Sequence, residues 1–125
     1  MVTVLQLLVG AMGLLFFVIG IGFLIRPAKT AAGFQLTAQG SQGLATLRAD
    51  MTAFFLGVGS FAVAGAWAAR ADLLLVPLIM VSVAFLGRAV SLFADGANPT
   101  AYPPMAVEAV MIALLLAARW TFGQG

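Results

Sequence analysis

Apolar residues fill four long stretches of the chain, and charged residues fall mostly near the ends of these stretches. A hydrocarbon core about 30 Å thick needs roughly 20 apolar residues in an α-helix. The sequence therefore predicts four transmembrane helices, at residues 3–25, 44–69, 73–94 and 104–120. We expect an all-α fold, an integral membrane bundle of four antiparallel helices that forms a single domain over residues 1–125.

Prolines, glycines and charges separate the predicted helices. Pro27 ends the first one, because its ring disfavours helical geometry at Arg26. A short turn around Arg70 joins the second and third helices, whereas the connections 26–43 and 95–103 are longer and leave the bundle at the opposite end. We call the end with the long connections side A and the other end side B. Lysines and arginines are almost evenly divided between the ends, with a slight preference for side A as the cytoplasmic side.

The composition narrows the function classes. Apolar residues make up 63% of the chain and charged residues 8%, whereas soluble domains have about 45–50% and about 25%. The chain has neither cysteine nor histidine, which removes thiol chemistry and the commonest metal ligand. We therefore expect no metal and no cofactor.

The expected location is a multi-pass position in a membrane, and specifically the bacterial inner membrane. The lipid bilayer is the first expected partner, and a membrane protein partner or a homo-oligomer stays open. The six Lys and Arg residues are scattered, so we expect no nucleic-acid partner. The first apolar run is too long for the core of a cleavable signal peptide, and none is expected.

Small residues recur at fourfold spacing in the second and fourth predicted helices. The two ridges are Ser60, Ala64 and Ala68, and Ala109, Ala113 and Ala117. Such ridges let helix backbones approach closely in lipid. We interpret them as packing surfaces inside one bundle, and a dimerisation face is the alternative.

Polar residues inside the predicted helices are the candidates for chemistry. A charge near the bilayer centre costs about 2.5–3.5 kcal/mol, so such residues need partners. Threading the four helices back and forth brings six of them to the side-A half, where we expect one polar cluster of Arg48, Asp50, Arg88, Ser91, Asp95 and Glu108. Arg88 and Glu108 lie deepest and are predicted to pair, with the guanidinium donating as a fork. Asp50 is expected to stabilise the N-terminus of its helix.

Two interpretations of this cluster remain open. In the first, the charges only fix helix order and register; in the second, they line a water-accessible cavity open to side A. The function we expect first is that of a non-enzymatic binding or accessory protein, with no catalytic residue. The alternative is a proton-coupled small-molecule transporter that acts as an oligomer, with Glu108 as the proton carrier. A membrane enzyme acting on a lipid-soluble substrate such as a quinone comes third.

Short motifs in a fixed order carry a resemblance over nearly the whole chain. They are Leu47-Arg48-Ala49-Asp50, Gly87-Arg88, Asp95-Gly96 and Glu108, set among four apolar spans. In this pattern the chain resembles the family of small bacterial membrane proteins called domain of unknown function 4345. The resemblance implies a four-helix membrane protein, broadly of the DoxX-like kind, and it implies no particular activity.

Overall fold

The computed structural model describes residues 1–97 and 99–124, and this part of the chain contains helices and no strand. Four helical segments are long and apolar enough to cross a membrane, and these are Val2–Ile25, Gly40–Ala68, Leu75–Ala94 and Pro99–Gly123. The elements in chain order are α1 (Val2–Ile25), α2 (Pro27–Ala32), α3 (Gly40–Thr46), the π-helical turn η1 (Leu47–Met51), α4 (Thr52–Ala68), α5 (Leu75–Ala94), the 3-10 turn η2 (Pro99–Ala101) and α6 (Tyr102–Gly123).

The second membrane-length helix begins earlier than predicted. Because α3, η1 and α4 follow one another without a break, this helix starts at Gly40 and not near residue 44. Asp50 therefore lies about three turns inside the helix. The expected role of Asp50 at a helix N-terminus is wrong, because the helix dipole acts only within the first turn.

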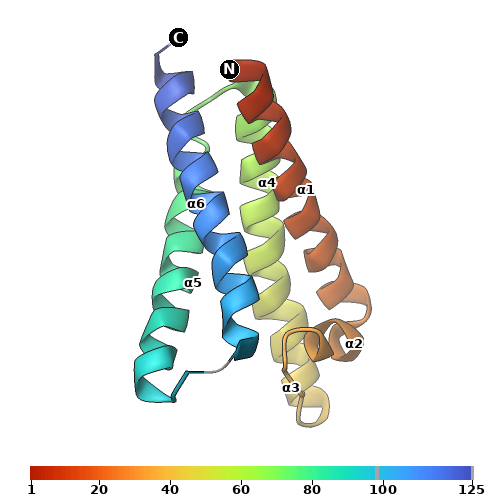
Figure 1. Ribbon diagram of the computed structural model, residues 1–125. Coiled ribbons are helices and arrows are strands. Elements are labelled where there is room, and N and C mark those ends of the chain that lie inside the picture. Colours follow the sequence, from red (N-terminus) through yellow and green to blue (C-terminus); the bar gives the residue numbers. More distant parts are fainter. Residues whose placement is uncertain (98, 125) are drawn as a thin grey trace.

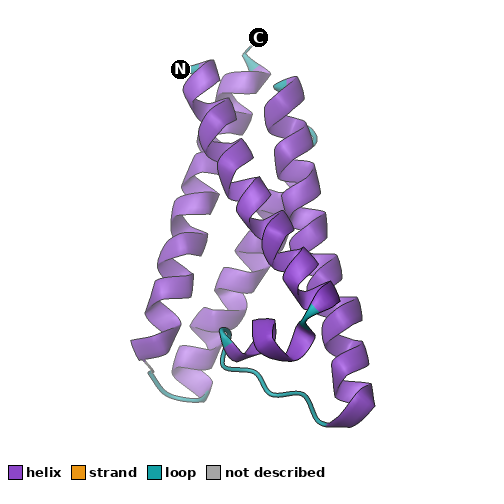
Figure 2. Cartoon of the chain, turned by 90° about the vertical axis from the view of Figure 1, so that its right-hand side faces the viewer, coloured by secondary structure: helices purple, strands orange, loops and turns teal. Residues whose placement is uncertain are grey.

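The chain runs up and down through the bundle. In Figure 1 both termini lie at the top, while α2, α3 and the connection from α5 to α6 lie at the bottom. The bottom of the picture is therefore side A. Figure 2 shows the short helix α2 and the loop that follows it lying across this end of the molecule. The segment 33–39 thus lies over the side-A end of the helices.

Helices α1 and α4 form the most extensive packing in the molecule, and α5 is the least buried of the four long helices. Glycine makes the α1–α4 contact close. A Cβ atom added at Gly59 would lie 2.6 Å from the carbonyl oxygen of Gly13 and 2.6 Å from the backbone nitrogen of Phe17. The two backbones are in direct contact there, so only glycine fits at position 59 without moving a helix.

The predicted packing role of the small-residue ridges is wrong. All six residues are exposed on the outside of the bundle, namely Ser60, Ala64, Ala68, Ala109, Ala113 and Ala117. The face of α4 that packs on α1 instead carries Gly59, Ala62 and Ala66. Small residues recur at helical spacing on two faces of α4, and the spacing alone does not tell which face meets α1.

At side B, α4 ends in a left-handed residue that is not glycine. Ala69 has φ +51°, the N–H of Arg70 donates to the carbonyl of Gly65 at 2.9 Å, and the N–H of Ala69 donates to Ala66 at 3.3 Å. These bonds satisfy carbonyls that the end of a helix leaves free. Left-handed geometry strains an alanine because of its Cβ atom.

The turn after α4 is also held by charged side chains. Arg70 donates two hydrogen bonds to Asp72, from Nε at 3.1 Å and from Nη2 at 2.5 Å. This contact lowers the pKa of Asp72 below its ordinary value of 3.8 and raises the pKa of Arg70. Arg119 of α6 donates from Nη1 to the carbonyl of Ala71 at 2.9 Å. The side-B turn is thereby tied to α6.

Candidate functional site

An ion pair joins α5 to α6 in the side-A half of the bundle. Nε of Arg88 donates to Oε2 of Glu108 at 3.1 Å. The Glu108 side chain is 9% exposed and that of Arg88 is 37% exposed. The predicted contact between these two residues is therefore present, with the carboxylate buried and the guanidinium half-buried.

The predicted fork geometry is wrong, and the difference leaves one oxygen of Glu108 unpaired. Arg88 reaches Glu108 through Nε alone, so only Oε2 accepts. Oε1 is buried and has no hydrogen-bond partner among residues 1–97 and 99–124. Leaving a buried acceptor unpaired costs about 1–3 kcal/mol, and more when the group is charged. Glu108 therefore keeps an unused acceptor for a hydrogen-bond donor.

Glu108 and Arg88 belong to the wall of a half-open cavity of about 430 Å³, which we call the inner cavity. Each of the four long helical segments contributes to this wall, and so does the loop after α2. The lining residues are Leu15, Phe16, Ile19, Phe34, Met51, Phe54, Phe55, Ala84, Arg88, Pro104, Val107 and Glu108. The cavity combines an apolar wall with one ion pair, the usual makeup of a site for a small ligand.

Four phenylalanines form the aromatic part of the apolar wall. Phe55 is at the centre of this group, with ring centroids 5.2 Å from Phe16, 5.4 Å from Phe34 and 5.1 Å from Phe54. Phe23 stacks on Phe55 at 5.5 Å from behind this lining. Rings at these separations hold one another in place, so the cavity has a firm aromatic side.

A second hollow of about 580 Å³, which we call the outer hollow, adjoins the inner cavity. Phe34, Arg88, Pro104 and Val107 line both. The other residues of the outer hollow come from the segment after α2, from α5 and from the connection to α6, and they include Ser91. Arg88 is therefore part of the partition between the inner cavity and a more polar space near side A.

The remaining members of the predicted cluster bond to other partners than the ion pair, or to none that the described residues supply. Ser91 donates to Asp95 at 2.7 Å along the exposed face of α5. Arg48 donates from Nε to the carbonyl of Leu24 at 3.2 Å, and so satisfies one of the carbonyls at the C-terminus of α1. Asp50 is exposed, and no ion pair of Asp50 occurs in the described part of the chain. The prediction of one six-residue cluster was therefore wrong: Glu108 pairs with Arg88, whereas Ser91 bonds to Asp95 and Arg48 bonds to the end of α1.

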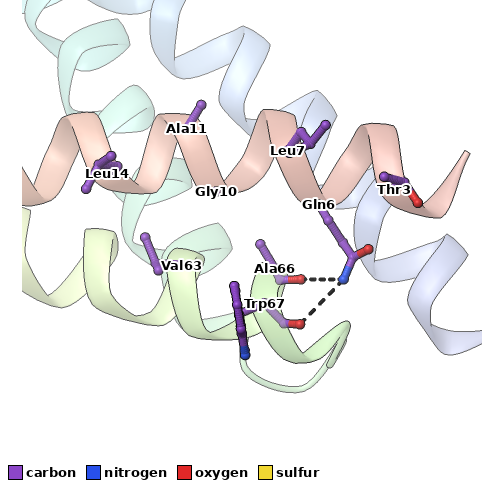
Figure 3. A pocket seen from close by; sticks show the side chains of 9 residues that line it. All are labelled: Thr3, Gln6, Leu7, Gly10, Ala11, Leu14, Val63, Ala66 and Trp67. Carbon is purple, nitrogen blue, oxygen red and sulfur yellow. Dashed lines mark hydrogen bonds between the residues drawn. The ribbon is translucent and has the colours of Figure 1, made fainter.

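A groove at side B shows a polar residue that the sequence analysis missed. Figure 3 shows Gln6 of α1 reaching to the end of α4, where Nε2 donates to the carbonyls of Ala66 at 2.9 Å and Trp67 at 3.5 Å. The groove has a volume of about 560 Å³ and its wall contains no ionisable side chain. Gln6 satisfies helix-end carbonyls, and this groove offers no chemistry comparable to that of the inner cavity.

Metal binding has no support in the described residues, which contain no group of three or more acidic side chains that could hold a metal ion.

A match over most of the chain decides the family. A family model described as domain of unknown function (DUF4345) matches residues 4–119. The chain belongs to this family. The match to DUF4345 covers all four membrane-length helices and both partners of the ion pair. No curated protein and no solved structure matches the chain. The broader DoxX-like resemblance stays a prediction.

The aromatic wall is the part of the site that the sequence analysis did not find. Phe16 and Phe23 are seven residues apart and thus share one helix face, which was a usable signal. Phe34 gave none, because it lies in a connection whose path over the bundle is set by tertiary packing.

Proposed function

We propose that this DUF4345 protein binds a small lipid-soluble molecule in the inner cavity and acts as a non-enzymatic binding or accessory protein. Its proposed location is the bacterial inner membrane, with side A toward the cytoplasm. The observation that carries the proposal is the combination of a buried, half-paired carboxylate with an aromatic wall in one cavity. An ion pair that served only to join α5 and α6 needs no cavity beside it.

The test is to fill the inner cavity. Ala84 lines it from α5, and Ala84→Phe would occupy much of its volume. Ala109→Phe is the matched control, because Ala109 is exposed on the outside of α6. We expect wild type and Ala109→Phe in nanodiscs to bind 4-hexylphenol or 4-hexylanisole above the level of empty nanodiscs, and Ala84→Phe to lose this binding. Equal binding by all three proteins, or by none, would refute the proposal.

A proton-coupled transporter is the second candidate. It is supported by the adjoining outer hollow, since Arg88, the partner of Glu108, lines both this hollow and the inner cavity. This candidate acts as a homo-oligomer, and the exposed small-residue ridges of α4 and α6 supply surfaces on which copies can pack closely.

Proteoliposomes that contain pyranine distinguish the transporter from the binding protein. A transporter predicts proton flux in the wild type that is lost in Glu108→Gln. Equal flux in both proteins excludes Glu108 as the carrier and leaves the binding function.

A further inference from the structure

The unpaired oxygen of Glu108 defines the kind of ligand that fits the inner cavity. We infer that the ligand carries a neutral hydroxyl group that donates a hydrogen bond to Oε1 of Glu108, and that its apolar body packs on the phenylalanine wall. This inference rests on the proposed binding function and deepens it by naming the ligand class.

The hydrogen-bond capacity of Glu108 calls for a donor on the ligand. An ionised carboxylate only accepts hydrogen bonds, and Oε2 already accepts one from Arg88. Oε1 is buried without a partner among the described residues, on a side chain that is 9% exposed. A ligand group that can only accept, such as an ether or ester oxygen, leaves Oε1 unsatisfied, and a donor satisfies it.

The charges of the ion pair favour a neutral ligand. Arg88 already balances the charge of Glu108 at 3.1 Å. A cationic ligand would bring a second positive charge beside the guanidinium, and an anionic ligand would meet the carboxylate. A neutral donor forms the missing hydrogen bond without adding a charge to a low-dielectric site.

The aromatic wall favours a flat or cyclic ligand body. Phe16, Phe54 and Phe55 offer ring faces and edges in the same wall as the ion pair. Aromatic rings prefer offset or edge-to-face packing on one another. A cyclic or aromatic body with a hydroxyl at one end therefore fits the cavity, with the hydroxyl toward Glu108.

The experiment compares two probes that share one apolar body, 4-hexylphenol and 4-hexylanisole. The hydroxyl of the first is a methyl ether in the second, so only the first donates. We expect the phenol to bind wild-type protein in nanodiscs roughly tenfold more tightly than the anisole, after correction for partition into empty nanodiscs. Equal affinity would overturn the inference, because it would mean that the phenol hydroxyl does not donate to Oε1, which then bonds to water or has no partner.

Glu108→Gln supplies the second arm. Its carboxamide can accept from Arg88 with its oxygen and present an N–H donor where Oε1 lies, so the preference for the phenol should disappear. Asp95→Asn is the matched control, because Asp95 is exposed and does not line the inner cavity, and it should keep the wild-type ratio. Loss of the preference in Asp95→Asn as well would overturn the assignment to Glu108.

The failures of the two proposals are distinguishable. Binding of neither probe to the wild type removes the binding function itself. Binding of both probes with equal affinity leaves the binding function and removes only the hydroxyl requirement.

Discussion

Replacing Gly59 by alanine tests the backbone contact between α1 and α4. The added Cβ atom would lie 2.6 Å from an oxygen and 2.6 Å from a nitrogen, both of them backbone atoms of α1. Ordinary contacts begin near 3.4 Å, so the helices must separate by roughly 0.8 Å. No side chain can rotate away to relieve this clash.

The expected cost follows from two opposing effects. Overpacking of this kind costs about 1–3 kcal/mol, while alanine gains up to about 1 kcal/mol in helix propensity over glycine. With a gain of about 1 kcal/mol set against that cost, we expect Gly59→Ala to lower the free energy of unfolding by up to about 2 kcal/mol net.

Gly57→Ala is the matched control, because a Cβ atom at Gly57 meets nothing within 4 Å. It should leave stability unchanged or raise it by up to about 1 kcal/mol. Helicity followed by circular dichroism during titration with SDS measures both variants. If Gly59→Ala were as stable as Gly57→Ala, the α1–α4 contact would be looser than described and the reasoning refuted.

Three further predictions concern the ion pair and the side-B turn. Arg88→Leu should destabilise the fold by up to about 3–5 kcal/mol, and by more than Glu108→Leu, because it leaves the more buried charge without its partner. In the same SDS titration, the double variant should lose less stability than the two single variants together. Ala69→Gly should raise the unfolding free energy by about 1 kcal/mol, since glycine removes the strain of left-handed geometry, and a lower stability would contradict the described end of α4. Because the pKa of Asp72 is lowered in the folded protein, its carboxylate stabilises the fold at pH values above the ordinary pKa of 3.8, and this stability is lost as the pH falls through the folded pKa. Unfolding measured over an acid pH series should therefore show a small loss of stability in this range, and Asp72→Asn should remove that loss.

The sequence predicted the parts of the fold that depend on length and hydropathy. An apolar run such as the one that forms α1 has to be a helix in lipid, because only then are all its backbone groups hydrogen-bonded. The start of the second helix was missed, because residues 40–43 are glycine, serine and glutamine and no residue of α3 is buried, so hydropathy gives no signal there.

Of the candidate site, only the ion pair was predicted from the sequence. Burial of two opposite charges in lipid forces a contact, and this is why the pair of Arg88 and Glu108 could be predicted. Near the headgroups a charge can reach water on its own, so nothing in the sequence fixed where Arg48 or Asp50 would point. The aromatic wall depends on how the helices are rotated, and the only sign of that rotation noted in the sequence is the spacing of Phe16 and Phe23 on one face of α1.

The sparse packing of α5 gives the molecule a stiff part and a compliant part. Helices α1 and α4 form the stiff part, because their backbones are in direct contact and their packing is the most extensive. Helix α5 forms the compliant part, because it is the least buried of the long helices, and the ion pair of Arg88 and Glu108 links it to α6. Acyl chains are as apolar as the side chains of α5, so lipid can refill any space that α5 leaves at little cost in free energy. If the inner cavity binds a ligand as proposed, we expect ligands of different size to be accommodated by a shift of α5, while α1 and α4 keep their contact.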